Sequence, residues 1–440
     1  MNYSEALHYL YHQLPSFERQ GASGYKPGLQ TSLALDRLTG CPHRSYRCIH
    51  VAGTNGKGST SHLMASTLQM QGYKVGLYTS PHIMDFRERI KVNGEKISEE
   101  EVVDFTQRCR EWVFEMQPTF FELTTAMAFE HFKRKEVDVA VIEVGLGGRL
   151  DSTNIITPIL SVITNISADH TQFLGATPAE IAAANAGIIK SHIPVVVGEA
   201  DGEVREVFER KASAMEAPII FAQDKPEVTD GSCSHGHCII QTRRYGTLQN
   251  ELNGLYQIKN SNTALTAIHA LQNMGIEIDE EAIRQGFARV VSNTGLFCRW
   301  QTLQEQPRVI CDSAHNVGAF KQIVRQLQAE HYDALRIVIG FMADKDVDHI
   351  LSLLPTHATY YFTQATTPRA LPAEQLQQKA SLHALHGKPY PTAAAAKQAA
   401  LADAHPADLI LITGSFYLLP ETTTHYPSAT YDIFSFIAIR

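Results

Sequence analysis

The fold is decided by the stretch HVAGTNGKGST, residues 50–60. Residues 46–51, which run into the start of this stretch, are typical of a short strand. Residues 59–71, which begin at its end, are typical of a helix that ends at Gly72. The apolar positions at helical spacing are Leu63, Met64 and Leu68. A strand, a glycine-rich turn and a helix in this order present backbone N–H groups and the positive end of a helix dipole at one point. This order predicts a loop that cradles phosphate groups.

Within this loop, glycine supplies backbone freedom and lysine supplies charge. The glycines let N–H groups crowd around phosphate oxygens, and Lys57 provides a point charge for the outer phosphates of ATP. Ser59 or Thr60 is expected to hold a magnesium ion. The predicted nucleotide-binding residues are Gly53, Thr54, Asn55, Gly56, Lys57, Gly58, Ser59 and Thr60.

The spacing of the loop differs from the common G-x-x-x-x-G-K-[ST] pattern. Ala52 precedes the first glycine, and Gly58 separates Lys57 from Ser59. The alternative is a glycine-rich turn that binds nothing. That alternative is disfavoured, because a lysine flanked by glycines after a strand has no evident packing role.

Further along the chain, strand-like runs alternate with segments long enough for helices. The first series lies at residues 75–79, 137–144, 159–164 and 194–197, and the second at 309–311, 336–339, 359–362 and 409–413. This alternation predicts an α/β protein with mainly parallel sheets. We expect a P-loop ATPase domain over residues 1–293 and a smaller Rossmann-like domain over 294–440. The linker is expected at 292–299.

The bulk composition excludes several classes of function. With 440 residues, 44% apolar and 19% charged, the chain is expected to fold into two domains. The net charge of −8 and the lack of a long basic run argue against nucleic-acid binding. We find no signal peptide and no apolar stretch that would span a membrane, so a cytoplasmic monomer is expected.

The seven cysteines are too few and too scattered for a disulfide framework, and cytoplasmic thiols are expected to stay reduced. Four soft metal ligands do fall within six residues: Cys233, His235, His237 and Cys238. So short a stretch does not readily wrap around one tetrahedral metal, and a solvated loop is expected instead.

The loop sequence AGTNGKGS resembles the P-loop of the Mur ligase superfamily, and other motifs narrow the resemblance to folylpolyglutamate synthase and dihydrofolate synthase. In the first half these motifs are YTSPH (78–82), FRERI (86–90), NGE (93–95), TFFE (119–122), EVGLGGRLDSTN (143–154), DH (169–170) and LG (174–175). In the second half they are Tyr256-Gln257 with Asn260, Cys298-Arg299, DSAHN (312–316) and DKD (344–346). The resemblance covers nearly the whole chain.

The resemblance implies a ligase that binds ATP between two domains and uses Mg²⁺. Its substrates would be L-glutamate and dihydropteroate or a reduced folate, and the reaction would pass through an acyl phosphate. The implied catalytic residues are Lys57, Glu143 and His170, with Ser59, Ser80, Glu143 and His170 as magnesium ligands. ATP would also contact Asn260, Arg299, Asp312 and His315. The implied substrate-binding residues are Ser80, Pro81, His82, Arg87, Arg89, Glu122 and Asp151.

Several of these residues also have a purely structural interpretation. Glu143 would then close a buried strand, and His170 would be an ordinary loop histidine, since imidazole is not a favoured magnesium ligand. Asp312 would cap a helix and His315 would lie in a turn. The alternative for Arg87, Arg89 and Glu122 is an exposed charged face.

One motif departs from the family pattern. Where the family usually has Glu-Lys-Ala-Gly-Ile, with a lysine whose carbamylated form binds the second magnesium ion, this chain has Ala184-Asn-Ala-Gly-Ile188. An amide lacks the charge of that carboxylate, so we expect weaker magnesium dependence at the second site. Milder departures are Tyr256 for His, Cys298 for Gly and Ser313 for Gly.

Two other functions compete with this interpretation. A peptidoglycan-precursor ligase is disfavoured, because only about 45 residues precede the P-loop strand, too few for a separate UDP-binding domain. A nucleotide-binding homologue that has lost catalysis is suggested by Asn185. Glutamate-dependent release of ADP distinguishes an enzyme from such a binder.

Overall fold

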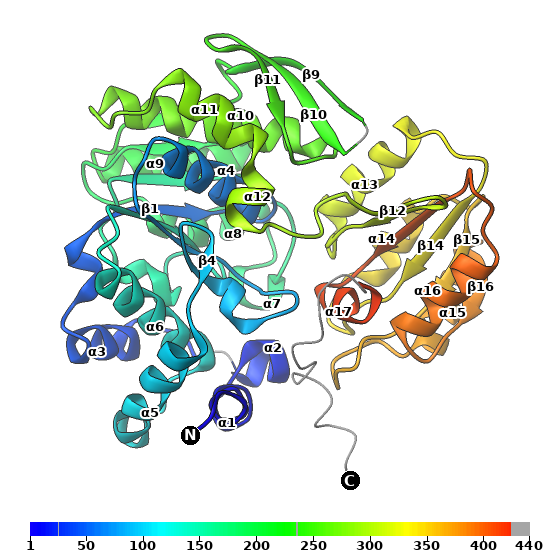
Figure 1. The fold of residues 1–440 in the computed structure, drawn as a ribbon, viewed down its shortest axis with the longest axis horizontal. Coiled ribbons are helices and arrows are strands. Elements are labelled where there is room, and N and C mark those ends of the chain that lie inside the picture. The colour runs from blue at the N-terminus through cyan, green and yellow to red at the C-terminus, as the bar shows by residue number, and fades with distance from the viewer. Residues whose placement is uncertain (25, 235, 424–440) are drawn as a thin grey trace. The chain divides into compact units, whose positions relative to one another are not determined.

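The computed structural model describes residues 1–24, 26–234 and 236–423, which form two compact units (Figure 1). The first unit comprises Met1–Glu251 and Tyr256–Leu296. The second comprises Leu252–Leu255 and the chain from Phe297 onward. The division therefore falls three residues after the boundary expected at 293, within the stretch expected to be the linker.

The first unit is built on an eight-stranded sheet with the order β4-β3-β2-β5-β1-β6-β7-β8. Its strands are β1 (Arg47–Ala52), β2 (Val75–Tyr78), β3 (Ile90–Val92), β4 (Glu95–Lys96), β5 (Val139–Glu143), β6 (Leu160–Ile163), β7 (Val195–Val197) and β8 (Ile219–Phe221). All neighbours are parallel except the pairs that involve β3 and β4, which are antiparallel. Strands β1, β5 and β6 are almost wholly apolar and buried, as expected for central strands covered on both faces.

Helices surround this sheet. They are α1 (Tyr3–His8), α2 (Phe17–Gln20), α3 (Gln30–Leu38), α4 (Lys57–Met70), α5 (Glu99–Met116), α6 (Phe120–Arg134), α7 (Thr171–Leu174), α8 (Pro178–Asn185), α9 (Gly202–Ala214), α10 (Tyr256–Asn273), α11 (Glu280–Ala288) and α12 (Val290–Thr294). Helix α4 contacts strands β2 and β5 as well as α10, α11 and α12, so it is buried on every side. At Gly286 of α11 an added Cβ would lie 2.5 Å from the Cα of Thr67, so this glycine allows the two backbones to approach closely.

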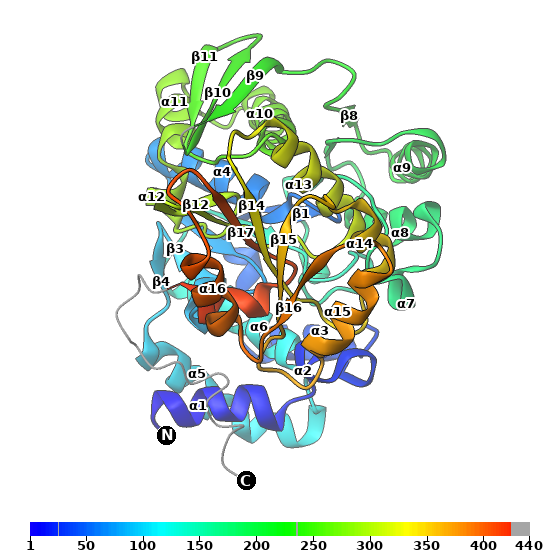
Figure 2. The same ribbon diagram turned by 90° about the vertical axis from the view of Figure 1, so that its right-hand side faces the viewer.

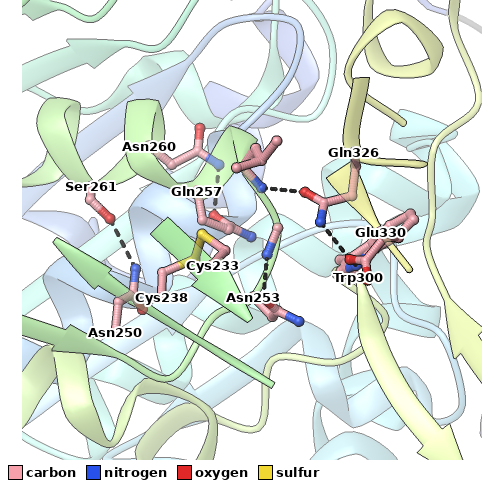
Figure 3. Close-up of a disulfide and its surroundings, with 12 residues drawn as sticks. Cys233, Cys238, Asn250, Asn253, Gln257, Asn260, Ser261, Trp300, Gln326 and Glu330 are labelled. Atoms are coloured by element: carbon pink, nitrogen blue, oxygen red, sulfur yellow. Dashed lines mark hydrogen bonds between the residues drawn. A yellow bond between two sulfur atoms is a disulfide. The ribbon is translucent and has the colours of Figure 1, made fainter. Parts of the chain in front are cut away.

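The segment expected to be a solvated loop is an antiparallel sheet, so that expectation was wrong. Its strands are β9 (Val228–Ser234), β10 (His237–Thr242) and β11 (Gly246–Asn250). Cys233 and Cys238 lie directly opposite each other in β9 and β10, with Cα atoms 4.0 Å apart, and form a disulfide (Figure 3). The expectation that all thiols are reduced is therefore also wrong. His235 lies outside the described residues, and the described part of the chain holds no group of three or more metal-ligating side chains.

We predict that protein purified without reductant contains one disulfide and five free thiols. Strand pairing holds the two hairpin cysteines face to face, whereas the other five are free: Cys41, Cys48, Cys109, Cys298 and Cys311. Titration with a thiol reagent in denaturant should count five thiols before reduction and seven after it. A count of seven before reduction would contradict this pairing.

The second unit contains a six-stranded sheet with the order β12-β13-β17-β14-β15-β16 (Figure 2). The strands are β12 (Gln301–Glu305), β13 (Arg308–Cys311), β14 (Leu335–Ile339), β15 (Thr359–Phe362), β16 (His386–Pro389) and β17 (Leu409–Thr413). Only β12 runs antiparallel to its neighbour. The helices are α13 (Val317–Ala329), α14 (Val347–Leu353), α15 (Ala373–Ser381), α16 (Ala393–Ala402) and α17 (Leu419–Thr422).

The predicted fold class is confirmed, because both units are α/β with mainly parallel sheets. The strands missed from the sequence are short or lie at sheet edges: β3, β4, β8, β12 and β16, together with the hairpin strands β9 to β11. Within the described residues, no helix combines the length and the apolar character needed to cross a membrane.

Candidate active site

Three chain segments with candidate site residues meet at one edge of the first sheet, because neighbouring parallel strands end there. Strand β1 lies between β5 and β6, and Val51 pairs with both Glu143 and Val162. The P-loop follows β1, Ser80 follows β2, and Glu143 is the last residue of β5. Ligands of open α/β sheets bind at this carboxyl edge, at points where the strand order reverses.

The first half of the P-loop is bonded to the segment that follows β6. Gly53 has φ +127°, and an added Cβ there would lie 2.1 Å from Oγ1 of Thr164. The N–H of Thr54 donates to the carbonyl of Asn165 at 2.8 Å, and the N–H of Asn55 donates to Oδ1 of Asn165 at 3.2 Å. The hydroxyl of Thr164 donates to the carbonyl of Asn55 at 2.7 Å. These bonds hold the start of the loop against the segment that follows β6.

The second half of the loop lies against helix α10. Gly56 has φ +85°, and an added Cβ would lie 2.3 Å from Oδ1 of Asn260, so only glycine fits beneath that side chain. Asn260 donates to Oε1 of Gln257 at 2.8 Å (Figure 3). Gln257 in turn donates to the hydroxyl of Ser59 at 3.2 Å. The structure thus brings the predicted ATP contact Asn260 onto the P-loop. It adds Gln257, which the sequence motif contained but which was not chosen as a site residue.

Lys57 is positioned by the loop itself. Its Nζ donates to the carbonyl oxygens of Gly53 at 2.9 Å and Thr54 at 3.2 Å. Lys57, Gly58 and Ser59 form the first turn of α4, where backbone N–H groups have no acceptor within the helix. Positive charge and N–H donors therefore gather at the same end of α4, as phosphate binding requires.

Glu143 and Ser80 provide oxygen donors beside this loop. One carboxylate oxygen of Glu143 accepts the N–H of Ser80 at 3.1 Å, and Glu143 is only 4% exposed. Protein magnesium sites commonly use one or two carboxylates together with substrate phosphates and water. A carboxylate and a hydroxyl at the end of adjacent strands, next to a phosphate loop, fit one magnesium ion of that kind.

The other residues considered for magnesium binding, His170, Ser59 and Asn185, lie on elements other than β2 and β5. His170 follows β6 and has φ +49°, with its Nε2 3.8 Å from a carboxylate oxygen of Asp169. The hydroxyl of Ser59 accepts from Gln257, and Ser59 is buried at the start of α4. Asn185 is buried at the end of α8. The weaker second magnesium site stays a prediction.

The predicted substrate residues after β2 form a buried polar cluster. His82 Nδ1 accepts from Nε of Arg89 at 2.8 Å, and His82 Nε2 lies 3.2 Å from the hydroxyl of Tyr11. Burial, with a contribution from the charge of Arg89, lowers the pKa of His82 well below its usual value, so this histidine is neutral. The guanidinium of Arg89 also lies 5.1 Å from the ring centre of Phe120. The neighbouring bond between Ser80 and Pro81 is cis.

Two further predicted substrate residues, Arg87 and Glu122, are bonded to residues two or three positions away in the sequence. Arg87 pairs with Asp85 at 2.8 Å. Glu122 completes a capping box with Thr119 at the start of α6. The alternative of an exposed charged face is wrong for Arg89 and Glu122, which are 0% and 3% exposed.

Asp151 is likewise buried, and it stabilises the loop that follows Glu143. Its carboxylate accepts the N–H of Leu146 at 2.8 Å and the N–H of Thr153 at 3.0 Å. The direct roles of Asp151, Arg87, Arg89 and Glu122 in substrate binding stay predictions.

In the second unit, three predicted ATP contacts lie together around Ser313. Arg299 donates to the Ser313 hydroxyl, and Nδ1 of His315 lies 3.0 Å from the Ser313 carbonyl. Asp312 accepts the N–H of Trp300 and the N–H of Ala314, both at 2.8 Å, which fixes the turn after β13. The helix that follows is capped by Asn316 instead, so the helix-cap interpretation of Asp312 is wrong.

The two units match models of two Mur ligase domains. The Mur ligase middle domain matches residues 51–268, and the Mur ligase glutamate ligase domain matches residues 298–416. The fold and the P-loop site are therefore those of a Mur ligase. Both the middle domain and the glutamate ligase domain of that class are present.

Comparison with individual relatives identifies the family within the Mur ligases to which this chain belongs. The dihydrofolate synthase/folylpolyglutamate synthase of Escherichia coli is 35% identical over 83% of this chain and 83% of the relative. The chain belongs to the folylpolyglutamate synthase and dihydrofolate synthase family, as its motifs predicted. A probable bifunctional folylpolyglutamate synthase/dihydropteroate synthase of Haloferax volcanii is 34% identical over 98% of this chain. This chain spans about half of that relative's length, 51%.

Solved structures agree with the family assignment. FolC of Escherichia coli, in complex with DHPP and ADP, has a TM-score of 0.82 at 32% identity and covers 96% of both chains. A bifunctional folylpolyglutamate synthase/dihydrofolate synthase with Mn, AMPPNP and L-glutamate bound has a TM-score of 0.79 at 28% identity. It covers 96% of this chain and 97% of that one.

Proposed function

We propose that this chain is an ATP-dependent ligase that joins L-glutamate to dihydropteroate, to the glutamate tail of a reduced folate, or to both. The observation that carries this proposal is the P-loop with Lys57 beside the Glu143–Ser80 pair, in a chain of this family. Relatives crystallised with DHPP and ADP, and with Mn, AMPPNP and L-glutamate, support the same substrates and a divalent metal.

The reaction requires the protein to position the reacting groups and to neutralise the negative charge of the phosphates. The γ-phosphate of ATP is transferred to the acceptor carboxylate, and the amine of glutamate then attacks the acyl phosphate to form an amide and release phosphate. Lys57 and the N–H groups of the first turn of α4 stabilise the negative charge that develops on the phosphate oxygens. Glu143 and Ser80 would hold Mg²⁺, which supplies further charge neutralisation when it is bound. A covalent enzyme intermediate is not required.

The location proposed for this reaction is the cytoplasm, where we expect the enzyme to act as a monomer. ATP and L-glutamate are abundant there, which supports the assignment. Disulfides are rare in cytoplasmic proteins, so the Cys233–Cys238 disulfide argues against this location, whereas the substrates favour it. This disulfide lies in the β9–β10 hairpin, which packs against α10, the helix that carries Gln257 and Asn260.

The test is the release of ADP by purified protein with ATP, Mg²⁺ and L-glutamate. Dihydropteroate and a tetrahydrofolate are supplied in separate reactions, with a reaction lacking acceptor as the blank and a UDP-linked peptidoglycan precursor as a further control. Turnover with both folate-type acceptors supports a bifunctional synthase. ATP binding without acceptor-dependent turnover would instead support the nucleotide-binding homologue, and turnover with the UDP-linked precursor alone would support the cell-wall ligase.

A further inference from the structure

Asn185, the residue that replaces the usual lysine, is bonded to the P-loop. Its Oδ1 accepts the N–H of Gly53 at 2.9 Å, and its Nδ2 donates to the carbonyl of Ile181 at 2.8 Å. Asn185 is 1% exposed. The two residues of the first bond are 132 positions apart in the sequence, so this bond is a tertiary contact between α8 and the phosphate loop.

The two partners settle which way the amide points. A backbone N–H requires the oxygen of the amide, and a backbone carbonyl requires its nitrogen. Ile181 lies one turn earlier in α8, so the bond to its carbonyl fixes the side chain against its own helix. The amide oxygen is thereby aimed at Gly53, whose φ of +127° is available only to a residue without a side chain.

The end of α8 also holds the loop that follows Glu143. The N–H of Arg149 donates to the carbonyl of Ala184 at 2.8 Å. At Gly148 an added Cβ would lie 3.0 Å from the carbonyl oxygens of Ala184 and Asn185. The same helix end is therefore in direct contact with both segments that carry the phosphate and magnesium chemistry, namely the P-loop and the loop after β5.

We infer that Asn185 is a positioning residue of the nucleotide site. It holds the start of the P-loop by accepting the Gly53 N–H, and it does not serve as a metal ligand. This inference rests on the nucleotide-binding part of the proposed function and does not depend on the folate acceptor. An unmodified lysine at this position would offer Gly53 only donors, whereas the amide oxygen of Asn185 accepts the Gly53 N–H.

The first experiment measures the affinity for ADP in EDTA, by calorimetry, with magnesium excluded. Asn185→Leu keeps the branching at Cγ but leaves the buried Gly53 N–H without its acceptor, so we expect ADP to bind about tenfold more weakly. Asn262→Leu is the matched control. Asn262 also accepts one backbone N–H, from Val228 at 3.1 Å, and donates to one backbone carbonyl, of Ala222 at 3.0 Å. It should lower stability comparably and leave the affinity for ADP within about twofold.

Two results separate the positioning role from a ligand role. If Asn185→Leu binds ADP like the unmodified protein in EDTA and loses affinity only when Mg²⁺ is added, Asn185 is a metal ligand and the inference is overturned. If both variants weaken ADP binding equally, the effect is one of general stability, which also overturns it. Failure of glutamate ligation would leave the ADP measurement unaffected, so the two proposals fail separately.

A second measurement uses the unmodified protein and so does not depend on whether the variant folds. Hydrogen exchange of the Gly53 amide should be slow in EDTA, because its N–H is bonded to a buried oxygen. Adding Mg²⁺ without nucleotide should leave the exchange rate unchanged. Faster exchange on adding Mg²⁺ would mean that Asn185 leaves Gly53 to bind the ion, contrary to the inference.

Discussion

Replacing Lys57 with methionine is expected to slow acceptor-dependent ADP release about a thousandfold. Methionine retains the unbranched apolar chain but removes the positive charge at the start of α4, where the γ-phosphate is transferred. This amine donates to the carbonyl oxygens of Gly53 and Thr54, both in the P-loop itself, so its loss should do little to the rest of the fold. Steady-state assays with ATP and acceptor varied separately measure the effect.

A matched lysine in the same unit provides the control for this loss. Lys259 of α10 is exposed and pairs with Glu199 at 2.6 Å, an interaction that solvent screens. Lys259→Met should therefore retain ADP release within about twofold. Comparable losses in both variants would show that charge on this face in general, and not the P-loop amine, supports the reaction.

Replacing Glu143 with glutamine is expected to reduce turnover about a hundredfold at a fixed magnesium concentration and to shift the magnesium titration to higher concentration. Glutamine keeps the size of the side chain and an oxygen that accepts the Ser80 N–H, but it removes the carboxylate charge. A loss that rising magnesium partly restores is the pattern expected when a metal ligand is weakened. The measurement is the rate of ADP release across a magnesium series.

The control is another buried carboxylate of the first unit. Glu227 is 5% exposed and accepts from Nε of Arg244 at 2.9 Å. Glu227→Gln should lower the midpoint of thermal unfolding without moving the magnesium titration. An unchanged titration in Glu143→Gln, with a loss of stability alone, would assign Glu143 to strand closure, the structural alternative considered from the sequence.

Local patterns predicted the central features of the site. Residues 50–60 specify a strand, a loop and a helix through neighbours in sequence, and the motifs around Ser80, Glu143 and Asp312 marked the ends of further strands. These predictions succeeded because parallel strands buried on both faces leave long apolar runs. The β9–β10 hairpin was missed because β9 is mostly exposed, β10 is buried only at alternate positions, and their pairing depends on register.

Contacts between distant segments required the tertiary structure. Nothing near Asn185 in sequence indicates that its amide meets Gly53, and nothing near Gln257 indicates that it reaches Ser59, 198 residues earlier. Sequence alone also left the charged residues after β2 open to an exposed position, whereas Arg89 is fully buried against His82 and Phe120.

The sequence by itself determined the family, the P-loop and the α/β class, since these depend on short spacings, glycine positions and apolar periodicity along a continuous chain. The tertiary structure alone decided which side chains order the loop, how Glu143 meets Ser80, and that Cys233 faces Cys238. Those features depend on strand order, register and helix packing. These bring together groups that are far apart in the sequence, and the sequence separation of two groups does not indicate their distance in space.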